Sequence, residues 1–255
     1  MGVMQKDNLG KVALVVALVA VAIAALMVFG SSMGLWEPIV GFMASRNYNN
    51  LLGYVVVVFS VLALVTSFSA KSSAKQNSRA KVKGILTSTI ALLLGLAILS
   101  PRIMALVIEP VKYPPIHDIT TNTQSPPQFE FLTDSRIGAR NSLVYGGEEI
   151  AAQQLKAFPT IGPIASDLSV EAAYQKALTV AKTMGWTIVA QDPKALRFES
   201  TATTPFFNFA DDVVIVVSAL EQGSRIDLRS VSRIGIGDAG VNAKRIQEFS
   251  QRFSR

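Results

Sequence analysis

The sequence predicts an α+β fold: three N-terminal transmembrane helices, then a small extramembrane domain with a four-stranded antiparallel sheet flanked by helices. Half of the 255 residues are hydrophobic and only 16% are charged, below the roughly 25% of soluble domains. Apolar residues of the N-terminal half form long runs, whereas those of the C-terminal half recur at helical or strand spacing. We therefore divide the chain into a membrane region (1–108), a proline-rich arm (109–131) and an α+β domain (132–255).

The membrane region is expected to hold three spans, at about 12–30, 51–69 and 84–100. The first run, Val12 to Phe29, contains only Val, Ala, Leu, Ile, Met and Phe. At about 1.5 Å per residue it is close to the ~30 Å of hydrocarbon that a helix must cross. A cleaved signal peptide is the alternative, but the run is long for one, no Ala-x-Ala cleavage site follows it, and it precedes two more spans. Pro101 is expected to kink or end the third helix.

Lysine and arginine side chains predict the orientation. Loops rich in these residues stay in the cytoplasm, and the loop between the second and third spans has five of them and no acidic residue. The N-terminus is then cytoplasmic, and three spans place the C-terminal domain in the periplasm of a multi-pass inner-membrane protein. The segment between the first two spans, with Trp36, Phe42 and Tyr48, is expected to be an external loop. The five cationic residues are Lys71, Lys75, Arg79, Lys81 and Lys83.

The remaining elements follow from proline content and periodicity. Prolines in the arm favour extended backbone and remove amide donors. Apolar residues at helical spacing predict a helix from Val170 to Met184, with Ser169 as its N-cap and Gly185 as its stop. Four strands are then expected, at 186–190, 196–202, 213–220 and 225–234, joined by turns that suit antiparallel hairpins. A closing helix from about Ala239 is expected to cover the sheet.

Several segments of the C-terminal half resemble a known family. They are 113–121 (YPPIHDITT), 184–186 (MGW), 209–212 (FADD) and 229–245, which begins Arg-Ser-Val-Ser-Arg. Together they resemble the bacterial and plastid family called domain of unknown function 1499, over about residues 113–255. The resemblance implies a domain that is often membrane-anchored or in the cell envelope, and it implies no established reaction.

Charged side chains near the end of the last predicted strand have two interpretations. Arg229 and Arg233 are expected to share a strand face, with Arg245 near the same corner, one helical turn beyond Asn242. In the first interpretation the arginines pair with aspartates and lock strand to strand and helix to sheet. In the second they bind a carboxylate or phosphate of a lipid headgroup or envelope intermediate. The candidate partners are Asp211, Asp212 and Asp227, and the candidate ligand-binding set is Arg229, Arg233, Asn242, Arg245, Asp211 and Asp212.

His117 and Asp118 are the place where a general base of near-neutral pKa could be built. Adjacent side chains on an extended segment point to opposite sides, however, and the chain has no Gly-x-Ser-x-Gly elbow. We therefore expect a hydrogen-bonded His117 to pin the arm. His117 acts as a base, with Asp118 beside it, only in the alternative of an enzyme that acts on a membrane-associated envelope substrate.

The segment 235–240 (GIGDAG) matches the dinucleotide-binding pattern G-x-G-x-x-G. A Rossmann unit needs a further parallel strand after the helix, for which the residues that follow leave no room. We expect these glycines to form a tight turn, with Asp238 as N-cap of the closing helix. Cysteine is absent and histidine occurs once, so thiolate metal sites are excluded. We predict no cofactor and no metal.

The charge distribution argues against nucleic acid as a partner. Residues 1–108 contain nine Lys and Arg against two acidic residues, whereas 109–255 contain fifteen against sixteen, so the domain has no basic excess. The spans contain no Asp, Glu, Lys, Arg or His, which disfavours a channel or transporter. The leading hypothesis is a noncatalytic envelope protein, anchored in the lipid bilayer, whose periplasmic domain binds a partner protein or an amphiphilic or anionic ligand. The enzyme with His117 as base and the arginines holding an anion is the alternative.

Overall fold

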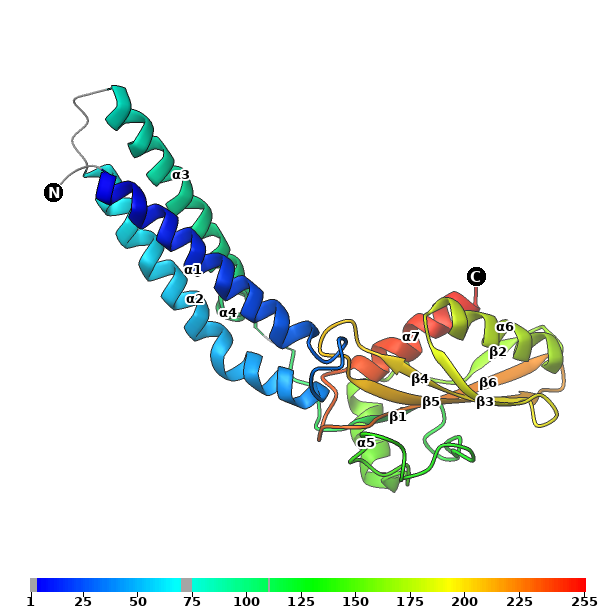
Figure 1. Cartoon of the computed structure of the whole chain (residues 1–255). Coiled ribbons are helices and arrows are strands. Elements are labelled where there is room, and N and C mark those ends of the chain that lie inside the picture. Colours follow the sequence, from blue (N-terminus) through cyan, green and yellow to red (C-terminus); the bar gives the residue numbers. More distant parts are fainter. Residues whose placement is uncertain (1–3, 70–74, 110) are drawn as a thin grey trace. The chain divides into compact units, whose positions relative to one another are not determined.

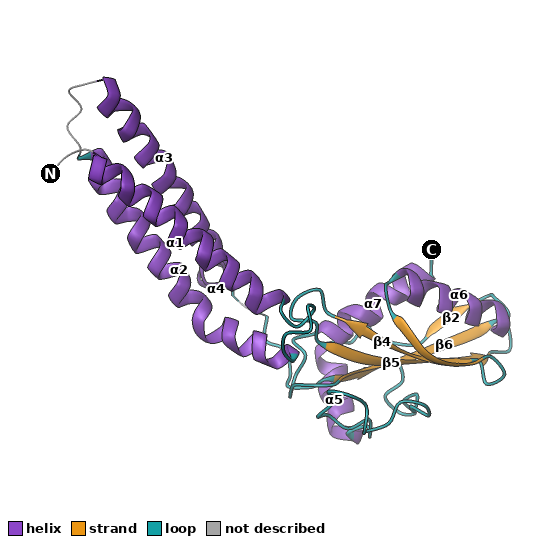
Figure 2. Ribbon diagram, viewed as in Figure 1, coloured by secondary structure: helices purple, strands orange, loops and turns teal. Residues whose placement is uncertain are grey.

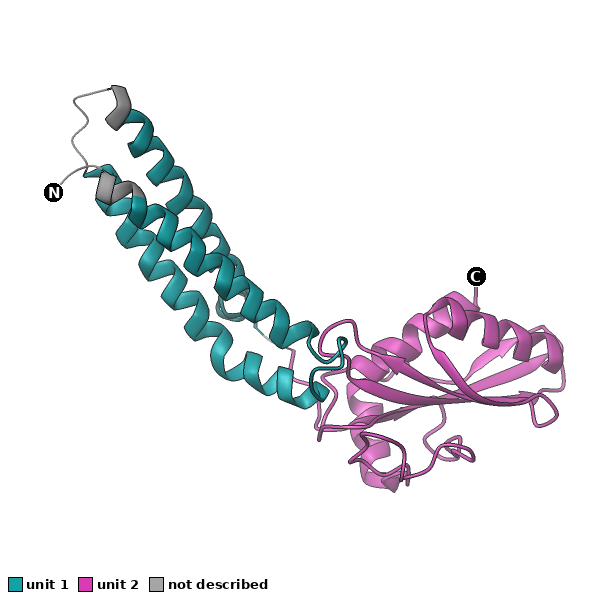
Figure 3. Ribbon diagram, viewed as in Figure 1, with its two compact units in different colours: residues 1–110 teal, residues 111–255 magenta. Residues whose placement is uncertain are grey.

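The computed structural model describes residues 4–69, 75–109 and 111–255. The chain forms two compact units, an N-terminal helical unit (residues 1–110) and a C-terminal domain (residues 111–255) (Figure 3). The division falls inside the proline-rich segment, so most of the expected arm belongs to the C-terminal domain. Lys71, of the basic loop, and Pro110, of the arm, lie outside the described residues.

The N-terminal unit contains three long helices, α1 (Met4–Phe29), α2 (Pro38–Phe68) and α3 (Lys75–Ile98), followed by the short α4 (Ser100–Val107) (Figure 1). The long helices are apolar and long enough to cross a membrane over Asn8–Phe29, Pro38–Phe68 and Ser78–Ile98, which confirms three apolar segments. Pro101 ends the third as predicted, because α3 stops at Ile98 and α4 restarts with the proline in its first turn. Asn49 Nδ2 donates to the Ile98 carbonyl at 2.8 Å, which satisfies an acceptor at the break.

Residues 38–50 form the first part of α2, so the prediction of a loop over these residues was wrong. Pro38 stands in the first turn, where its fixed φ favours a helix start. The helix runs for 31 residues, about 46 Å at the usual rise, and thus exceeds the ~30 Å of a hydrocarbon core. Hydropathy marks where apolar residues begin, and a helix does not have to begin there.

The three long helices pack through small side chains. Buried positions recur every three or four residues, which brings the backbones close together. A Cβ on Gly10 would lie 2.8 Å from the carbonyl oxygen of Gly84, so α1 and α3 approach too closely for a side chain there. The buried small residues include Gly10, Ala13, Ala17 and Ala20 of α1, Gly53, Ser60 and Ala63 of α2, and Gly84, Ser88, Ala91 and Gly95 of α3.

The C-terminal domain is built on one antiparallel sheet (Figure 2). The strand order is β1-β6-β5-β4-β3, and β2 pairs with β6 on the same side as β1. The sheet therefore has six strands rather than the four predicted, because β1 and β2 were not foreseen. The strands are β1 (Asp118–Thr120), β2 (Ile164–Ser166), β3 (Thr187–Asp192), β4 (Arg197–Thr203), β5 (Ala210–Ala219) and β6 (Ser224–Ser232).

Helices cover both faces of this sheet (Figure 1). The helices α6 (Val170–Thr183) and α7 (Val241–Phe253) lie on one face, and α5 (Gly147–Ala157), which was not predicted, lies on the other. Ser169 caps α6 as expected, accepting from the Ala172 amide at 3.2 Å, and Gly185 follows with φ +78°. The main core fills the space between the sheet and α6 and α7, where Trp186 stacks on Phe249 with ring centroids 5.5 Å apart.

Candidate functional site

Strand alternation decides which of the charged side chains meet. Asp211 and Asp212 are successive residues of β5, opposite Ser232 and Val231 of β6. Because successive side chains point to opposite faces of a sheet, the two aspartates lie on opposite faces. We call the face toward α6 and α7 the helix face, and the other, toward the loops of residues 121–146, the loop face.

On the helix face, Asp211 belongs to a buried network at the start of α7. Arg245 donates to the Asp211 carboxylate at 2.5 Å, to Ser230 Oγ at 3.1 Å and to Asn242 Oδ1. Ser230 Oγ also donates to Asn242 Oδ1, at 2.6 Å, and Asn242 Nδ2 donates to the backbone carbonyl of His117 at 2.9 Å. The network thus joins α7 to β5, β6 and the residue before β1.

On the loop face, Arg229 is fully buried and is bound from every side. Its guanidinium forms a bidentate pair with Asp118, at 2.9 and 2.7 Å, and donates to the Leu143 carbonyl at 2.7 Å. The rings of Phe129 and Tyr145 lie 5.6 and 5.3 Å from it, within the range of cation–π attraction. Burial raises the pKa of Tyr145 to about 12, with a smaller contribution from the charge of Asp118.

Asp212, also on the loop face, accepts hydrogen bonds from two arginines. Arg136 Nε donates to it at 2.6 Å and Arg233 Nη2 at 2.8 Å, while Thr201 Oγ1 donates at 2.8 Å. The Asp212 carboxylate is fully buried, so each of these donors offsets its loss of hydration. Arg136 thus ties residues 133–141 to β5, and Arg233 ties the end of β6 to it.

The six predicted ligand-binding side chains are therefore all engaged within the chain. The expected common corner for Arg229 and Arg245 was wrong, because the sheet lies between them. Arg233 and Arg245 pair with aspartates that were candidates, but Arg229 pairs with Asp118 instead. The remaining candidate, Asp227, pairs with Arg225 at 2.7 Å.

His117 and Asp118 diverge, as the extended segment predicts. His117 Nδ1 lies 3.1 Å from the Ile236 carbonyl oxygen, to which the tautomer protonated there donates. Asp118 turns the other way, to Arg229. His117 thus links the segment before β1 to the glycine-containing loop 233–240 that follows β6.

Loop 233–240 forms the tight connection expected of its glycines. Gly240 has φ +79°, and a Cβ there would lie 2.5 Å from the Tyr113 ring. Gly240, rather than Asp238, is the residue at the cap position of α7. Asp238 nevertheless accepts from the amides of Gly240 at 2.9 Å and Asn242 at 2.7 Å. Burial raises the pKa of the Asp238 carboxyl, against these two hydrogen bonds, which lower it.

Three further buried polar residues were not predicted from the sequence, namely Arg136, Arg197 and Glu199. Arg136 lies in a loop without periodicity, and its role depends on Asp212, 76 positions later. Glu199 of β4 is fully buried and accepts from three consecutive amides, those of residues 130–132, at 2.6 to 3.2 Å. Arg197 donates to Glu199 at 3.4 Å and to Glu130. The alternation of charged residues in Arg197-Phe-Glu199 was an available signal, although it does not identify partners.

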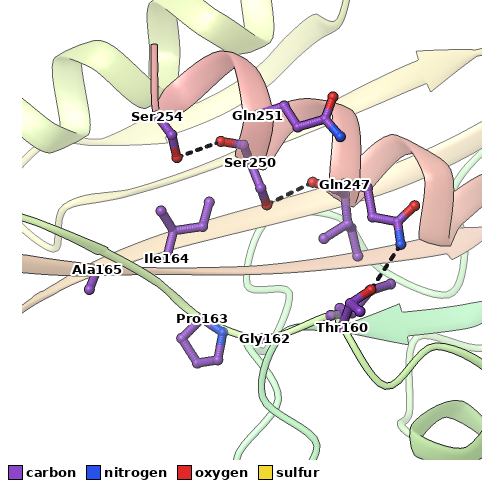
Figure 4. Close-up of a pocket in the computed structure, with 11 residues that line it drawn as sticks. Thr160, Gly162, Pro163, Ile164, Ala165, Gln247, Ser250, Gln251 and Ser254 are labelled. Atoms are coloured by element: carbon purple, nitrogen blue, oxygen red, sulfur yellow. Dashed lines mark hydrogen bonds between the residues drawn. The ribbon is translucent and has the colours of Figure 1, made fainter.

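A groove of about 620 Å³ lies between β2 and the C-terminal half of α7 (Figure 4). Buried side chains of Ile164 and Ile246 form part of its lining, while Thr160 and Gln247, joined at 3.3 Å, contribute polar groups. No residue of the lining is charged. The lining residues are Thr160, Ile161, Gly162, Pro163, Ile164, Ala165, Ile246, Gln247, Ser250, Gln251 and Ser254.

Comparison with known proteins bears on the C-terminal domain. The family model described as protein of unknown function (DUF1499) matches residues 118–253, just over half of the chain. The match begins at β1 and ends with α7, so it contains the whole sheet and the Arg229–Asp118 pair. It also contains the helix-face network except His117 and the groove lining except Ser254. No curated protein matches the chain.

Proposed function

Since this chain belongs to the DUF1499 family and carries three membrane-length apolar helices, we propose that it is a noncatalytic, membrane-anchored envelope protein. Its C-terminal domain binds an extended segment of a partner protein in the groove between β2 and α7. The membrane is the inner membrane, with the N-terminus in the cytoplasm and the C-terminal domain in the periplasm. The cationic residues before the third span, among them Arg79, Lys81 and Lys83, support this orientation.

The outer edge of β2, which pairs with no further strand in the part of the chain that the structure describes, is the observation that carries the proposal. β2 pairs with β6 on one side, and the groove lies beside it. An extended peptide can add to such an edge through main-chain hydrogen bonds, while its side chains occupy an adjoining groove. Thr160, Gln247 and Gln251 offer neutral hydrogen-bonding groups, and Ile164 and Ile246 offer apolar surface. An uncharged lining suits a peptide better than it suits an anionic ligand.

Photo-crosslinking in native membranes tests this proposal. A photoreactive residue in place of Gln251 should crosslink to a protein, and the substitution Gly162→Phe should abolish the adduct. Gly162 belongs to the groove lining and has no atom within 4 Å of the position of a Cβ, so a side chain introduced there begins in open space. The matched control is the same photoreactive residue at the exposed Glu248 of α7, which is outside the groove lining.

Three results would contradict the proposal. The first is equal crosslinking from positions 251 and 248, and the second is an adduct that persists in the Gly162→Phe variant. The third is an adduct with lipid instead of protein, which would point to the amphiphilic ligand. In each case the groove would not be a site for a partner peptide.

A further inference from the structure

The two most exposed large apolar side chains among the described residues of the C-terminal domain lie at one end of the sheet. Ile137 is 90% exposed and Ile236 is 80% exposed. Ile236 belongs to loop 233–240, which follows β6, and Ile137 belongs to the loop that Arg136 ties to Asp212. Single exposed apolar side chains are ordinary, but two from neighbouring loops at one end form an apolar tip.

The backbone carbonyl of each tip residue accepts a hydrogen bond that holds its loop in place. Arg233 Nη1 donates to the Ile137 carbonyl at 2.9 Å, and His117 Nδ1 lies 3.1 Å from the Ile236 carbonyl. Asn141 Nδ2 bridges the two loops, donating to the carbonyls of Ser232 at 2.9 Å and Gly235 at 2.8 Å. The backbone beneath each isoleucine is therefore ordered before any contact is made, which lowers the entropic cost of binding.

The chain enters the domain at this same end. The arm packs on loop 233–240, since a Cβ at Gly237 would lie 3.1 Å from Pro115 and one at Gly240 would meet the Tyr113 ring. Ten residues separate α4, which ends at Val107, from β1, and they can extend at most about 35 Å. The apolar tip therefore lies at the end of the domain that a short segment joins to α4.

The opposite end of the sheet has a different character. Its turns carry Asp192, Lys194 and Glu221, and its exposed apolar residue Leu220 is 43% exposed. With nine residues in β6, the two ends are about 30 Å apart. The end of the sheet at which the chain enters the domain is therefore apolar, and the end about 30 Å away is polar.

Two lysines lie in the segments next to loop 233–240, the arm and the start of α7. Lys112 precedes Tyr113 in the arm, and Lys244 lies in the first turn of α7, where its amide bonds to the Gly240 carbonyl; both lysines are exposed. Two carboxylates lie nearby: Asp238 accepts from the amides of Gly240 and Asn242, and Asp134, in the loop of Ile137, accepts from Ser142 Oγ and the Leu143 amide. Exposed lysines beside apolar side chains are the combination that anionic lipid surfaces attract.

We propose that Ile137 and Ile236 insert into the surface of the anionic bilayer that anchors the chain, with Lys112 and Lys244 beside lipid phosphates. His117 and Arg233 are positioning residues, which hold the two loops that present the isoleucines. This role is independent of the groove between β2 and α7. It gives the domain a fixed orientation on the membrane.

Because the chain has no cysteine, single labelling sites can be introduced cleanly. The variants Ile137→Cys, Ile236→Cys and the control Leu220→Cys, each in the full-length chain, are labelled with an environment-sensitive fluorophore. The proteins are placed in vesicles of phosphatidylethanolamine and phosphatidylglycerol that contain spin-labelled lipid. Labels at 137 and 236 should shift their emission to shorter wavelength and be quenched by the lipid, whereas the label at 220 should be quenched by aqueous iodide.

Two outcomes would overturn the proposal. One is quenching by iodide at 137 and 236 that equals quenching at 220, which would mean that the tip faces water. The other is protection at 137 and 236 from both quenchers, which would mean that protein covers the tip. The double substitution Lys112→Gln and Lys244→Gln should reduce lipid quenching in phosphatidylglycerol vesicles and leave it unchanged in pure phosphatidylcholine. An equal effect in both lipids would refute the role of the lysines.

Discussion

Arg229 is the residue on which the loop face depends most. A guanidinium with no exposed surface has lost its hydration, and it recovers that energy through Asp118, the Leu143 carbonyl and two aromatic rings. Its sequence neighbours gave a reason to expect an ion pair, but they did not identify the partner. Asp118 lies 111 positions away, and only the pairing of β1 with β6 brings the two together.

Removing one member of this pair should therefore destabilise the domain strongly. We expect Asp118→Asn to cost about 3–5 kcal/mol, because it leaves a buried guanidinium without its counter-charge. The double variant Asp118→Asn with Arg229→Met should recover part of the loss. Urea denaturation of the full chain in detergent, followed through hydrogen exchange of β6 amides, measures both effects. A single variant as stable as the natural chain would contradict the importance of this pair.

Tyr145 predicts a loss of stability in alkali. Its folded-state pKa of about 12 exceeds the ordinary value of 10.0, so the unfolded chain releases the phenolic proton first as pH rises. Stability should thus fall as pH rises from about 10 to about 12, and Tyr145 should cause no further loss once it is ionised in both states. The Tyr145 hydroxyl is buried without a hydrogen-bond partner among the described residues, so Tyr145→Phe should change neutral-pH stability by less than about 1 kcal/mol. The variant should lose less stability above pH 10, and parallel stability curves for the two proteins would contradict the assignment.

At the scale of elements, the long and periodic segments were predictable, and the short ones were not. Three apolar helices, the four later strands, α6 and α7 follow from hydropathy and periodicity. Most of their ends are displaced by a few residues, but α2 and α3 begin well before the predicted spans, at Pro38 and Lys75. The strands β1 and β2 have three residues each, too few for a pattern, and they exist because β6 pairs with them. In α5 the buried residue is Gln154, whose side-chain amide accepts from the Thr120 backbone amide and donates to the Thr120 carbonyl. Because this buried position is polar, the helix has no apolar stripe from which it could be predicted.

The turn between β5 and β6 packs directly against the end of β2 and requires a glycine there. Gly223 has φ +82°, and a Cβ there would overlap the Ser166 carbonyl oxygen at the end of β2. Gly223→Ala should therefore displace β2 and cost more than about 1 kcal/mol, since both strain and overlap act. Hydrogen exchange should show reduced protection at β2. Gly162→Ala is the control, because open space surrounds that position. Equal protection in the two variants would refute this account.

At the scale of the whole molecule, the distribution of charge predicts a topology. The sequence between the second and third apolar helices is cationic, whereas the C-terminal domain is nearly balanced. A phosphatase fused after Arg255 should therefore be active in the periplasm, and a fluorescent protein that folds only in the cytoplasm should stay dark there. The reverse pattern would contradict both the orientation and the envelope location that we propose.

The place of β6 in the sheet has a consequence for how the chain matures. It pairs with β1, β2 and β5, yet it is the last of the six strands along the chain, beginning at Ser224. Until β6 has left the ribosome, β1 and β2 have no strand to pair with, and the sheet cannot close. The domain must therefore complete its fold after β6 has been synthesised, and a chain truncated before β6 would leave its apolar strands open to aggregation or proteolysis.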